Sequence, residues 1–433
     1  MTVIKWILIR GLIGLALALA AAAAVPVRHV VAPDEAPAEL SQPVLWHRFP
    51  TGAPPVREVR VLIAGKCDEV ELRAEEGVVF RDADDRVVAR GDAGDWTAVK
   101  PGPDGGLAVA DDGRHSSLWA SPTLDGATLF VRTRRDGRRS ETYEYFGRLQ
   151  LLPGDRGLID LINHVDVERY VACVTCNEVW PTFHADAFRG QAIVARTYVL
   201  YQMLRRNAAD FDVSATQGSQ VYRGVQRDRA GRRAAAAAQY TRGVALTWPD
   251  GGTDRLFCAY YSAACGGRSQ SAAIFGPAGD VAPLAGGVVC DYCRIAPGKT
   301  YRWGPERFKK RTVYERLTAA DPELAALGGL RRAEVSQTTS DGRAIAVRLA
   351  GENGASPEVL AERFRLAVDP MLIRSTHFEM EDGGDELIFK NGRGFGHGLG
   401  LCQWGMQAQA REGRSVSEIL QHYYPGSRLT RVY

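Results

Sequence analysis

The 433-residue sequence has almost no excess of either charge, because its 54 Lys and Arg and 51 Asp and Glu residues leave a formal net charge of +3. A charge this small argues against a nucleic-acid-binding surface and allows only weak attraction to anionic polymers. The sequence also lacks an internal repeat of useful length. With 45% hydrophobic and 24% charged residues, it is typical of a globular chain long enough for two or three domains.

Charged side chains are missing between Gly11 and Val27, a run rich in Leu and Ala that follows Lys5 and Arg10. This pattern is typical of a secretory signal, and small residues at 21–24 suit cleavage. The apolar residues 6–9 lengthen the run, so an uncleaved membrane anchor is the alternative. Both readings predict an exported protein of the periplasm or cell wall. The six prolines in residues 28–55 indicate a linker.

The remaining chain predicts an α+β fold that is β-rich, with a two-helix catalytic segment and several mixed strand and helix subdomains. Short alternating runs separated by turn residues predict strands across 56–150. Helical spacing predicts one helix that is capped by Asp166 and ends near Glu178, and a second over about 185–205.

After the second helix, strands are predicted at 244–248 and 255–264. Residues 305–327 are predicted to be helical, 331–351 to form a hairpin, and 401–413 to form a helix. We therefore predict a β-rich N-terminal part (56–150), a catalytic core (151–300), an inserted helix-hairpin subdomain (301–365) and the C-terminal part of the core (366–433).

Glu178 is the strongest candidate for chemistry. It lies where the first helix should end, beside the apolar residues Val179 and Trp180. Such a carboxyl is partly desolvated, which raises its pKa and lets it hold a proton as a general acid requires. The alternative is a helix-end carboxylate that forms a salt bridge or a cap.

Arg189 and Arg196 lie seven residues apart, on one face of the second predicted helix and at the border of its apolar stripe. Guanidinium groups in that position are partly buried and need a carboxylate or an acidic ligand. Glu178 is one possible partner. A surface salt bridge is the alternative for Arg196.

The segment GRGFGHGLG carries alternating glycines around His397 and lacks the GK[ST] of a phosphate-binding loop. Glycines on one face of an extended segment let a backbone or a flat ligand approach closely while His397 projects. A close-packed strand with a structural histidine is the alternative. Gln403 and Trp404 follow, and they offer a hydrogen bond and a stacking face to a sugar or else serve in packing.

The eight cysteines of an exported chain permit disulfides. Cys258 and Cys265 flank a predicted strand, and Cys290 and Cys293 form a CxxC motif. Four thiolates in two pairs also suit tetrahedral zinc. We expect that the protein requires no cofactor for activity and that a zinc ion at these cysteines would be structural.

Taken together, residues 58–432 resemble the stage II sporulation protein D family, also called the amidase-enhancer family. The segments that carry the resemblance, in order, are YEYFGRLQLL, LINHVDVERYVACVTCNEV, DAFRGQAIVARTYVL, YYSAACGGRSQSA and GHGLGLCQWGM. The sequence departs from the family pattern at Val179, where methionine is usual, and at Leu401, Cys402 and Trp404, where Met, Ser and Tyr are usual.

The resemblance implies a lytic transglycosylase that cleaves the bond between N-acetylmuramic acid and N-acetylglucosamine and leaves 1,6-anhydro ends. It places the catalytic glutamate at Glu178, the family's basic pair at Arg189 and Arg196, and its active-site histidine at His397. The predicted substrate-binding residues are these two arginines and His397 together with Tyr261, Ser262, Gln403 and Trp404. Zinc in some family members favours a metal at Cys258, Cys265, Cys290 and Cys293, although a nearby histidine ligand is missing. The implied partner is the peptidoglycan glycan strand. The rival prediction is a non-catalytic enhancer that recruits an N-acetylmuramoyl-alanine amidase or a membrane partner.

Overall fold

The computed structural model describes residues 58–102, 105–110, 112–206, 209–275 and 281–433. The predicted signal or anchor (1–27) and linker (28–55) lie outside these residues. The described chain divides into two compact units. The N-terminal unit comprises the described residues of 58–258 together with the terminal segment 428–433, and the C-terminal unit comprises those of 259–427. The boundary falls inside the segment 151–300 that the sequence predicts as one core.

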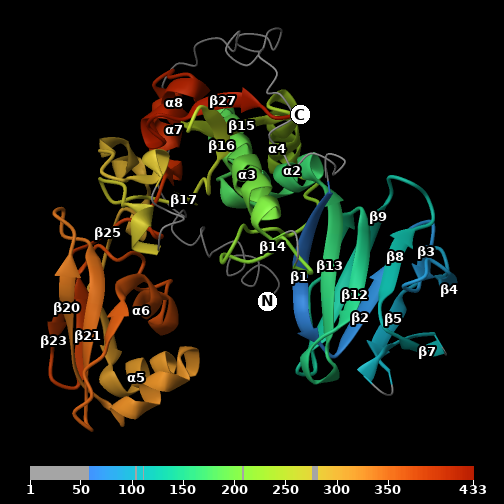
Figure 1. Cartoon of the computed structure of the whole chain (residues 1–433), viewed down its shortest axis with the longest axis horizontal. Coiled ribbons are helices and arrows are strands. Elements are labelled where there is room, and N and C mark those ends of the chain that lie inside the picture. The colour runs from blue at the N-terminus through green and yellow to red at the C-terminus, as the bar shows by residue number, and fades with distance from the viewer. Residues whose placement is uncertain (1–57, 103–104, 111, 207–208, 276–280) are drawn as a thin grey trace. The chain divides into compact units, whose positions relative to one another are not determined.

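The N-terminal unit contains two seven-stranded sheets and one three-stranded sheet, in the orders β14-β1-β13-β12-β8-β3-β4, β10-β9-β2-β5-β6-β7 with β11 on β9, and β16-β15-β27. Antiparallel pairing sets β1 beside β13 and β13 beside β12, as Figure 1 shows. The strands are β1 (Glu58–Cys67), β2 (Glu69–Arg73), β3 (Val78–Arg81), β4 (Val87–Gly91), β5 (Thr97–Pro101), β6 (Leu107–Val109), β7 (Asp112–His115), β8 (Leu118–Pro122), β9 (Thr128–Arg135), β10 (Arg138–Arg139), β11 (Tyr143–Phe146), β12 (Arg148–Pro153), β13 (Ile159–Asp166), β14 (Val213–Ser214), β15 (Val244–Asp250), β16 (Thr253–Leu256) and β27 (Arg428–Arg431).

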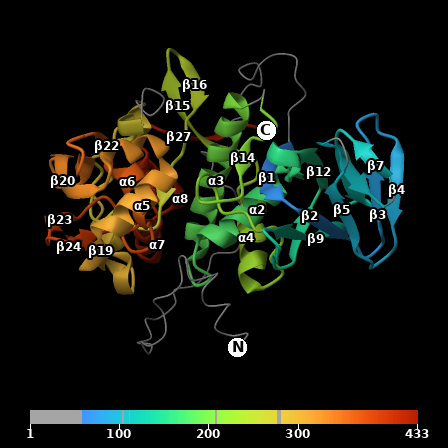
Figure 2. The same ribbon diagram turned by 90° about the horizontal axis from the view of Figure 1, so that it is seen from below.

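Three helices of this unit pack together: α2 (Val167–Glu178), α3 (Ala185–Arg205) and α4 (Arg229–Tyr240). They lie side by side in Figure 2, and α3 also contacts β15. The bounds predicted for the first two helices are confirmed. The environment of α3 differs from the predicted single apolar stripe, because every residue from Gly190 to Leu200 is buried. The helix is a central core element with neighbours on several sides.

The C-terminal unit is built from small sheets and four helices. Its pairings are β17-β26, β18-β25, β19-β24-β23 and β20-β21-β22. Its elements are β17 (Tyr261–Ser262), β18 (Arg302–Trp303), β19 (Glu306–Lys309), α5 (Lys310–Ala320), β20 (Leu330–Thr338), β21 (Ala344–Gly351), β22 (Glu358–Leu360), α6 (Ala361–Val368), β23 (Glu379–Asp382), β24 (Glu386–Lys390), β25 (Gly392–Arg393), β26 (Leu401–Cys402), α7 (Gln403–Arg411) and α8 (Val416–Tyr423).

Residues 302–390 share one hydrophobic core, in which Phe364, Phe378 and Phe389 are buried. The predicted hairpin is confirmed by β20 and β21, and the predicted helix near 401–413 by α7. The prediction of a continuous helix over 305–327 is wrong. Residues 306–309 instead form β19, which pairs with β24. Phe308 is the one buried residue of the four, and its neighbours along the strand point toward the opposite face. Pro322 then separates α5 from a 3₁₀ turn.

The described residues contain no helix that is both long and apolar enough to cross a membrane. As predicted, the fold is α+β and rich in strands.

Candidate functional site

Glu178 is the last residue of α2, and only 8% of the residue is exposed. The helix begins where the Asp166 carboxylate accepts hydrogen bonds from the N–H groups of Glu168 and Arg169, at 2.9 and 3.3 Å. It ends because Val179 adopts an extended conformation. The predicted place of Glu178, a buried carboxyl at a helix end, is therefore confirmed.

The backbone N–H of Val221 donates a hydrogen bond of 2.8 Å to Oε1 of Glu178. Both neighbours of Val221 are buried and bonded to the core. Gln220 accepts a hydrogen bond from the hydroxyl of Tyr170 (3.1 Å), and Tyr222 donates one of 2.7 Å to Oδ1 of Asn163. The donor that orients the Glu178 carboxyl is thus held in place from both sides.

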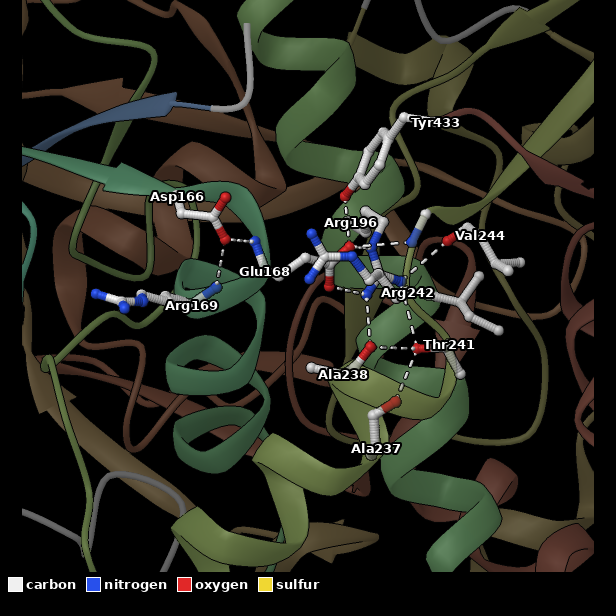
Figure 3. Close-up of polar contacts among 12 residues, drawn as sticks. Asp166, Glu168, Arg169, Arg196, Ala237, Ala238, Thr241, Arg242, Val244 and Tyr433 are labelled. Atoms are coloured by element: carbon white, nitrogen blue, oxygen red, sulfur yellow. Dashed lines mark hydrogen bonds and ion pairs between the residues drawn. The ribbon is translucent and has the colours of Figure 1, made fainter. Parts of the chain in front are cut away.

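Arg196 is fully buried, and all three guanidinium nitrogens have partners in the protein (Figure 3). Nε and Nη2 form a bidentate pair with the Glu168 carboxylate at 3.0 and 2.6 Å. Nη1 donates to the Val244 carbonyl (3.0 Å) and to Thr241 Oγ1 (3.4 Å), and Nη2 also donates to the Ala238 carbonyl (3.2 Å). The suggested pairing with Glu178 is therefore wrong. The physical reason is that α3 lies in the core, where α2 supplies a nearer carboxylate.

Glu168 completes this network. The same carboxylate accepts hydrogen bonds from the Gly243 N–H (3.0 Å) and the Tyr433 hydroxyl (2.6 Å). Burial raises the pKa of Glu168, but the charge of Arg196 and these hydrogen bonds outweigh burial and lower the pKa overall. Because the network uses the donors of Arg196 internally, the substrate-binding role predicted for Arg196 is replaced by a structural one.

Arg189, one of the predicted binding residues, differs from Arg196 in its exposure. Its side chain is 29% exposed and pairs with Asp186 at 2.9 Å. The guanidinium also lies over the ring of Tyr240, 3.9 Å from the centroid. Arg189 is thus held at the edge of the core, and its predicted contact with substrate stays a prediction.

In the C-terminal unit, the two motif segments around residues 260–267 and 394–404 lie together. Tyr261 pairs with Leu401 and Ser262 pairs with Cys402 in the parallel β17-β26 ladder. Tyr261, Ser262, His397, Gln403 and Trp404 therefore come from adjoining segments of one unit, whereas Glu178, Arg189 and Arg196 belong to the N-terminal unit.

His397 is half-buried, and its Nδ1 accepts a hydrogen bond of 2.9 Å from the Leu399 N–H. The proton of the neutral ring then resides on Nε2, and the ring also bonds the backbone of Tyr261. Burial lowers the pKa of His397 to about 4. This geometry favours the structural alternative, in which a neutral His397 joins the two motif segments, over a projecting proton carrier.

Three other predicted binding residues are buried in the same unit: Ser262, Gln403 and Trp404, with 6%, 4% and 8% exposed. Trp404 therefore offers little open face for a sugar to stack on, which favours its packing alternative. The Ser262 hydroxyl is buried and has no hydrogen-bond partner among the described residues. Tyr261 is half-buried. Sugar binding by these residues remains a prediction.

Four buried cysteines of the C-terminal unit, Cys265, Cys290, Cys293 and Cys402, gather their Sγ atoms within 4.8 Å of one another. The predicted ligand set is thus wrong at one position. Cys258 lies in the N-terminal unit, where its Sγ accepts a hydrogen bond from Gln202 Nε2 at 3.6 Å. Hydrogen bonds from the neighbouring thiols, Cys265 first, lower the pKa of Cys290. Among the described residues, no disulfide joins Cys265, Cys290, Cys293 and Cys402.

Sequence reasoning missed two residues of these sites. Glu168 is not among the predicted site residues, and nothing local in the sequence connects it to Arg196, 28 residues away. Cys402 had been noted only as a departure from the family serine. One feature of the sequence could have indicated that Cys402 belongs with the other thiols: it replaces the usual serine inside a glycine-rich motif.

With this fold and site in view, comparison with known proteins shows a similarity: residues 155–248 match the family described as Stage II sporulation protein. The match spans Glu178, Arg189 and Arg196 and ends before the C-terminal unit. The resemblance predicted from the sequence is confirmed.

Individual relatives extend the similarity beyond this segment. Stage II sporulation protein D of Bacillus subtilis (strain 168) is 24% identical over 324 residues, which cover 72% of this chain and 87% of the relative. An uncharacterized protein of Brachyspira hyodysenteriae is 29% identical over 323 residues, 74% and 78% of the two chains. The amidase enhancer of Bacillus subtilis is 35% identical over 72 residues, 17% of this chain and 10% of that protein.

Proposed function

We propose that this chain is an exported lytic transglycosylase that cleaves peptidoglycan glycan strands between N-acetylmuramic acid and N-acetylglucosamine. The observation that carries the proposal is the position of Glu178. It is a buried carboxyl at the end of α2, inside the family-matched segment, with one oxygen oriented by the Val221 N–H.

The surroundings of Glu178 suit a group that both gives and takes a proton. Burial disfavours a charged carboxylate, and so does the carbonyl end of α2, where the helix dipole is negative. The Val221 N–H stabilises a carboxylate once the proton has left. A carboxyl balanced in this way acts first as general acid and then as general base.

In the proposed reaction, protonated Glu178 gives its proton to the glycosidic oxygen, and the N-acetylglucosamine side leaves as an alcohol. The Glu178 carboxylate then takes the proton of the muramoyl C6 hydroxyl, whose oxygen attacks C1 of its own sugar. The glycosidic C–O bond breaks, the new C1–O6 bond forms the 1,6-anhydro ring, and the carboxyl is protonated again. No water is consumed.

This route needs one carboxyl group, whereas ordinary glycoside hydrolysis needs two, roughly 5–9.5 Å apart. Asp186 is the acid nearest to Glu178 after the helix end in sequence, and its carboxylate is paired with Arg189 at 2.9 Å. An acid held by a guanidinium is a poor nucleophile or base. The pairing therefore supports the intramolecular reaction over hydrolysis.

The test is incubation of the purified full chain with glycan strands, with and without stem peptides, followed by mass spectrometry. We expect anhydro-muramoyl ends, and we expect Glu178→Gln to lower their rate by roughly 10²–10⁴-fold, the usual contribution of a general acid and base. Asp186→Asn is the matched control and should retain most activity. Reducing ends in place of anhydro ends, or an active Glu178→Gln variant, would refute the proposal.

The similarity to the amidase enhancer supports a second candidate function, in which the chain binds glycan and stimulates an N-acetylmuramoyl-alanine amidase. This function does not need the Glu178 carboxyl. If glycan cleavage is absent while wild type and Glu178→Gln raise amidase turnover equally, the enhancer function holds and the transglycosylase function fails.

A further inference from the structure

The four thiols of Cys265, Cys290, Cys293 and Cys402 form a buried cluster that the proposed reaction does not use. Each residue is at most 1% exposed. The four come from three separate chain segments: the turn after β17, the 3₁₀ helix Asp291–Ile295 together with its N-cap Cys290, and the strand β26. Among the described residues, the group of possible metal ligands at this place consists of four thiols and includes no histidine or carboxylate.

The spacing of the sulfur atoms fits one tetrahedral metal ion. A zinc ion bound by four thiolates at about 2.3 Å holds each pair of sulfur atoms about 3.8 Å apart. The Sγ atoms of Cys265 and Cys293 are 3.8 Å apart, and all four lie within 4.8 Å of one another. A disulfide would require about 2.05 Å between two sulfur atoms, and an iron-sulfur cluster would require room for several metal and sulfide ions among the four.

Polar groups that donate hydrogen bonds surround the sulfur atoms, as they do around thiolates bound to a metal. The Cys265 N–H donates to Cys402 Sγ at 3.3 Å. The hydroxyl of Tyr423 lies 3.1 Å from Cys290 Sγ and accepts a hydrogen bond of 3.1 Å from Gln409 Nε2. Because this oxygen already accepts a hydrogen bond from Gln409, its own O–H is available to donate to the sulfur of Cys290.

The backbone of α7 comes unusually close to the cluster at Gly405. A Cβ atom there would lie 2.6 Å from Cys290 Sγ and 2.0 Å from the Tyr423 hydroxyl. A glycine is required at this position because no larger residue fits between the helix and the sulfur atoms. The four thiols are therefore tightly packed against α7 and Tyr423.

From this geometry we infer that Cys265, Cys290, Cys293 and Cys402 bind one structural zinc ion. Four protein ligands in a buried place leave no open coordination position, so the ion is structural and not catalytic. It replaces the set of Cys258, Cys265, Cys290 and Cys293 that the sequence suggested. The inference does not depend on the proposed reaction, because it concerns the metal content alone.

The site would join the two motif segments of the C-terminal unit. Cys265 lies three residues after Ser262, and Cys402 immediately precedes Gln403. The β17-β26 ladder between these segments is only two residues long on each side, so it contributes few hydrogen bonds. A metal ion bound by Cys265 and Cys402 at the carboxyl end of this ladder would cross-link the two segments, and Cys290 and Cys293 would connect the ion to the intervening loop.

The first test measures metal in the full chain purified without chelators. We expect about one zinc per chain by elemental analysis, and alkylation of Cys265, Cys290, Cys293 and Cys402 after denaturation without reductant. Cobalt substitution should give the intense sulfur-to-cobalt absorption of a tetrathiolate site. Two disulfides with no metal, or iron in place of zinc, would overturn the inference.

The second test compares matched cysteine variants. Cys402→Ser should weaken zinc binding, measured by chelator competition, by more than the roughly 10–100-fold that loss of an outer-shell partner costs. Cys258→Ser, which changes a thiol outside the cluster, should keep wild-type zinc. Should Cys402→Ser fail to fold, a zinc-reversible fall in the melting temperature of the wild type on chelation supports the site, and an unchanged melting temperature overturns it. Equal zinc content in Cys402→Ser and Cys258→Ser would also overturn the inference.

Discussion

Replacement of Arg196 by methionine tests the buried network of the N-terminal unit. Methionine keeps most of the volume of the side chain but removes its charge and its five N–H donors. It leaves Glu168, which is 8% exposed, as a buried carboxylate without its guanidinium partner. Breaking a buried ion pair from one side costs about 3–5 kcal/mol of unfolding free energy. The carbonyl groups of Val244 and Ala238 also lose a donor, which adds to this cost.

The assay is urea and thermal unfolding of the purified variant. For a unit of this size, about 1 kcal/mol shifts the melting temperature by about 2–4 °C, so we expect a fall of roughly 6–20 °C. Arg189→Met is the control on the same helix. Its pair with Asp186 is partly exposed, so its loss should cost about 1 kcal/mol or less.

The double variant Arg196→Met with Glu168→Gln separates the loss of the pair from the cost of leaving one charge buried. Because it leaves no uncompensated charge, it should be at least about 1 kcal/mol more stable than the sum of the two single changes implies. A loss below about 1 kcal/mol for Arg196→Met, or simple additivity in the double variant, would refute the argument that this pair is a central element of the core.

Two further predictions concern pH and packing. Since the folded state lowers the pKa of Glu168 below its ordinary value of 4.5, its stabilising contribution is complete above that value and disappears as pH falls through the folded pKa. The stability difference between wild type and Glu168→Gln in urea unfolding should therefore shrink below about pH 4.5, and a difference that is constant from pH 7 to pH 3 would contradict it. Gly405→Ala places a methyl group 2.6 Å from Cys290 Sγ, so it should lower both the melting temperature and the zinc content, whereas unchanged values would mean that α7 moves freely away from the cluster.

Local patterns in the sequence were enough to predict the framework around Glu178. The cap at Asp166, the end of α2 at Glu178 and the bounds of α3 all depend on residues within a few positions of one another, and all three are confirmed. The burial of Glu178 followed from its apolar neighbours. The prediction of a helix over 305–327 was wrong at residues 306–309, because pairing with β24 stabilises a strand there despite the local helical pattern.

The partners of the key side chains were decided only by tertiary structure. Arg196 meets Glu168 across 28 residues, Glu168 meets Tyr433 across 265, and the Cys265 N–H meets Cys402 across 137. The sequence alone determined that a helix-end glutamate and several thiols were present, because helix ends and residue types are local properties. The packing of distant segments decided which carboxylate neutralises Arg196. It also decided that Cys402, and not Cys258, joins the other three thiols. Folding brings charges and thiols together without regard to their separation along the chain.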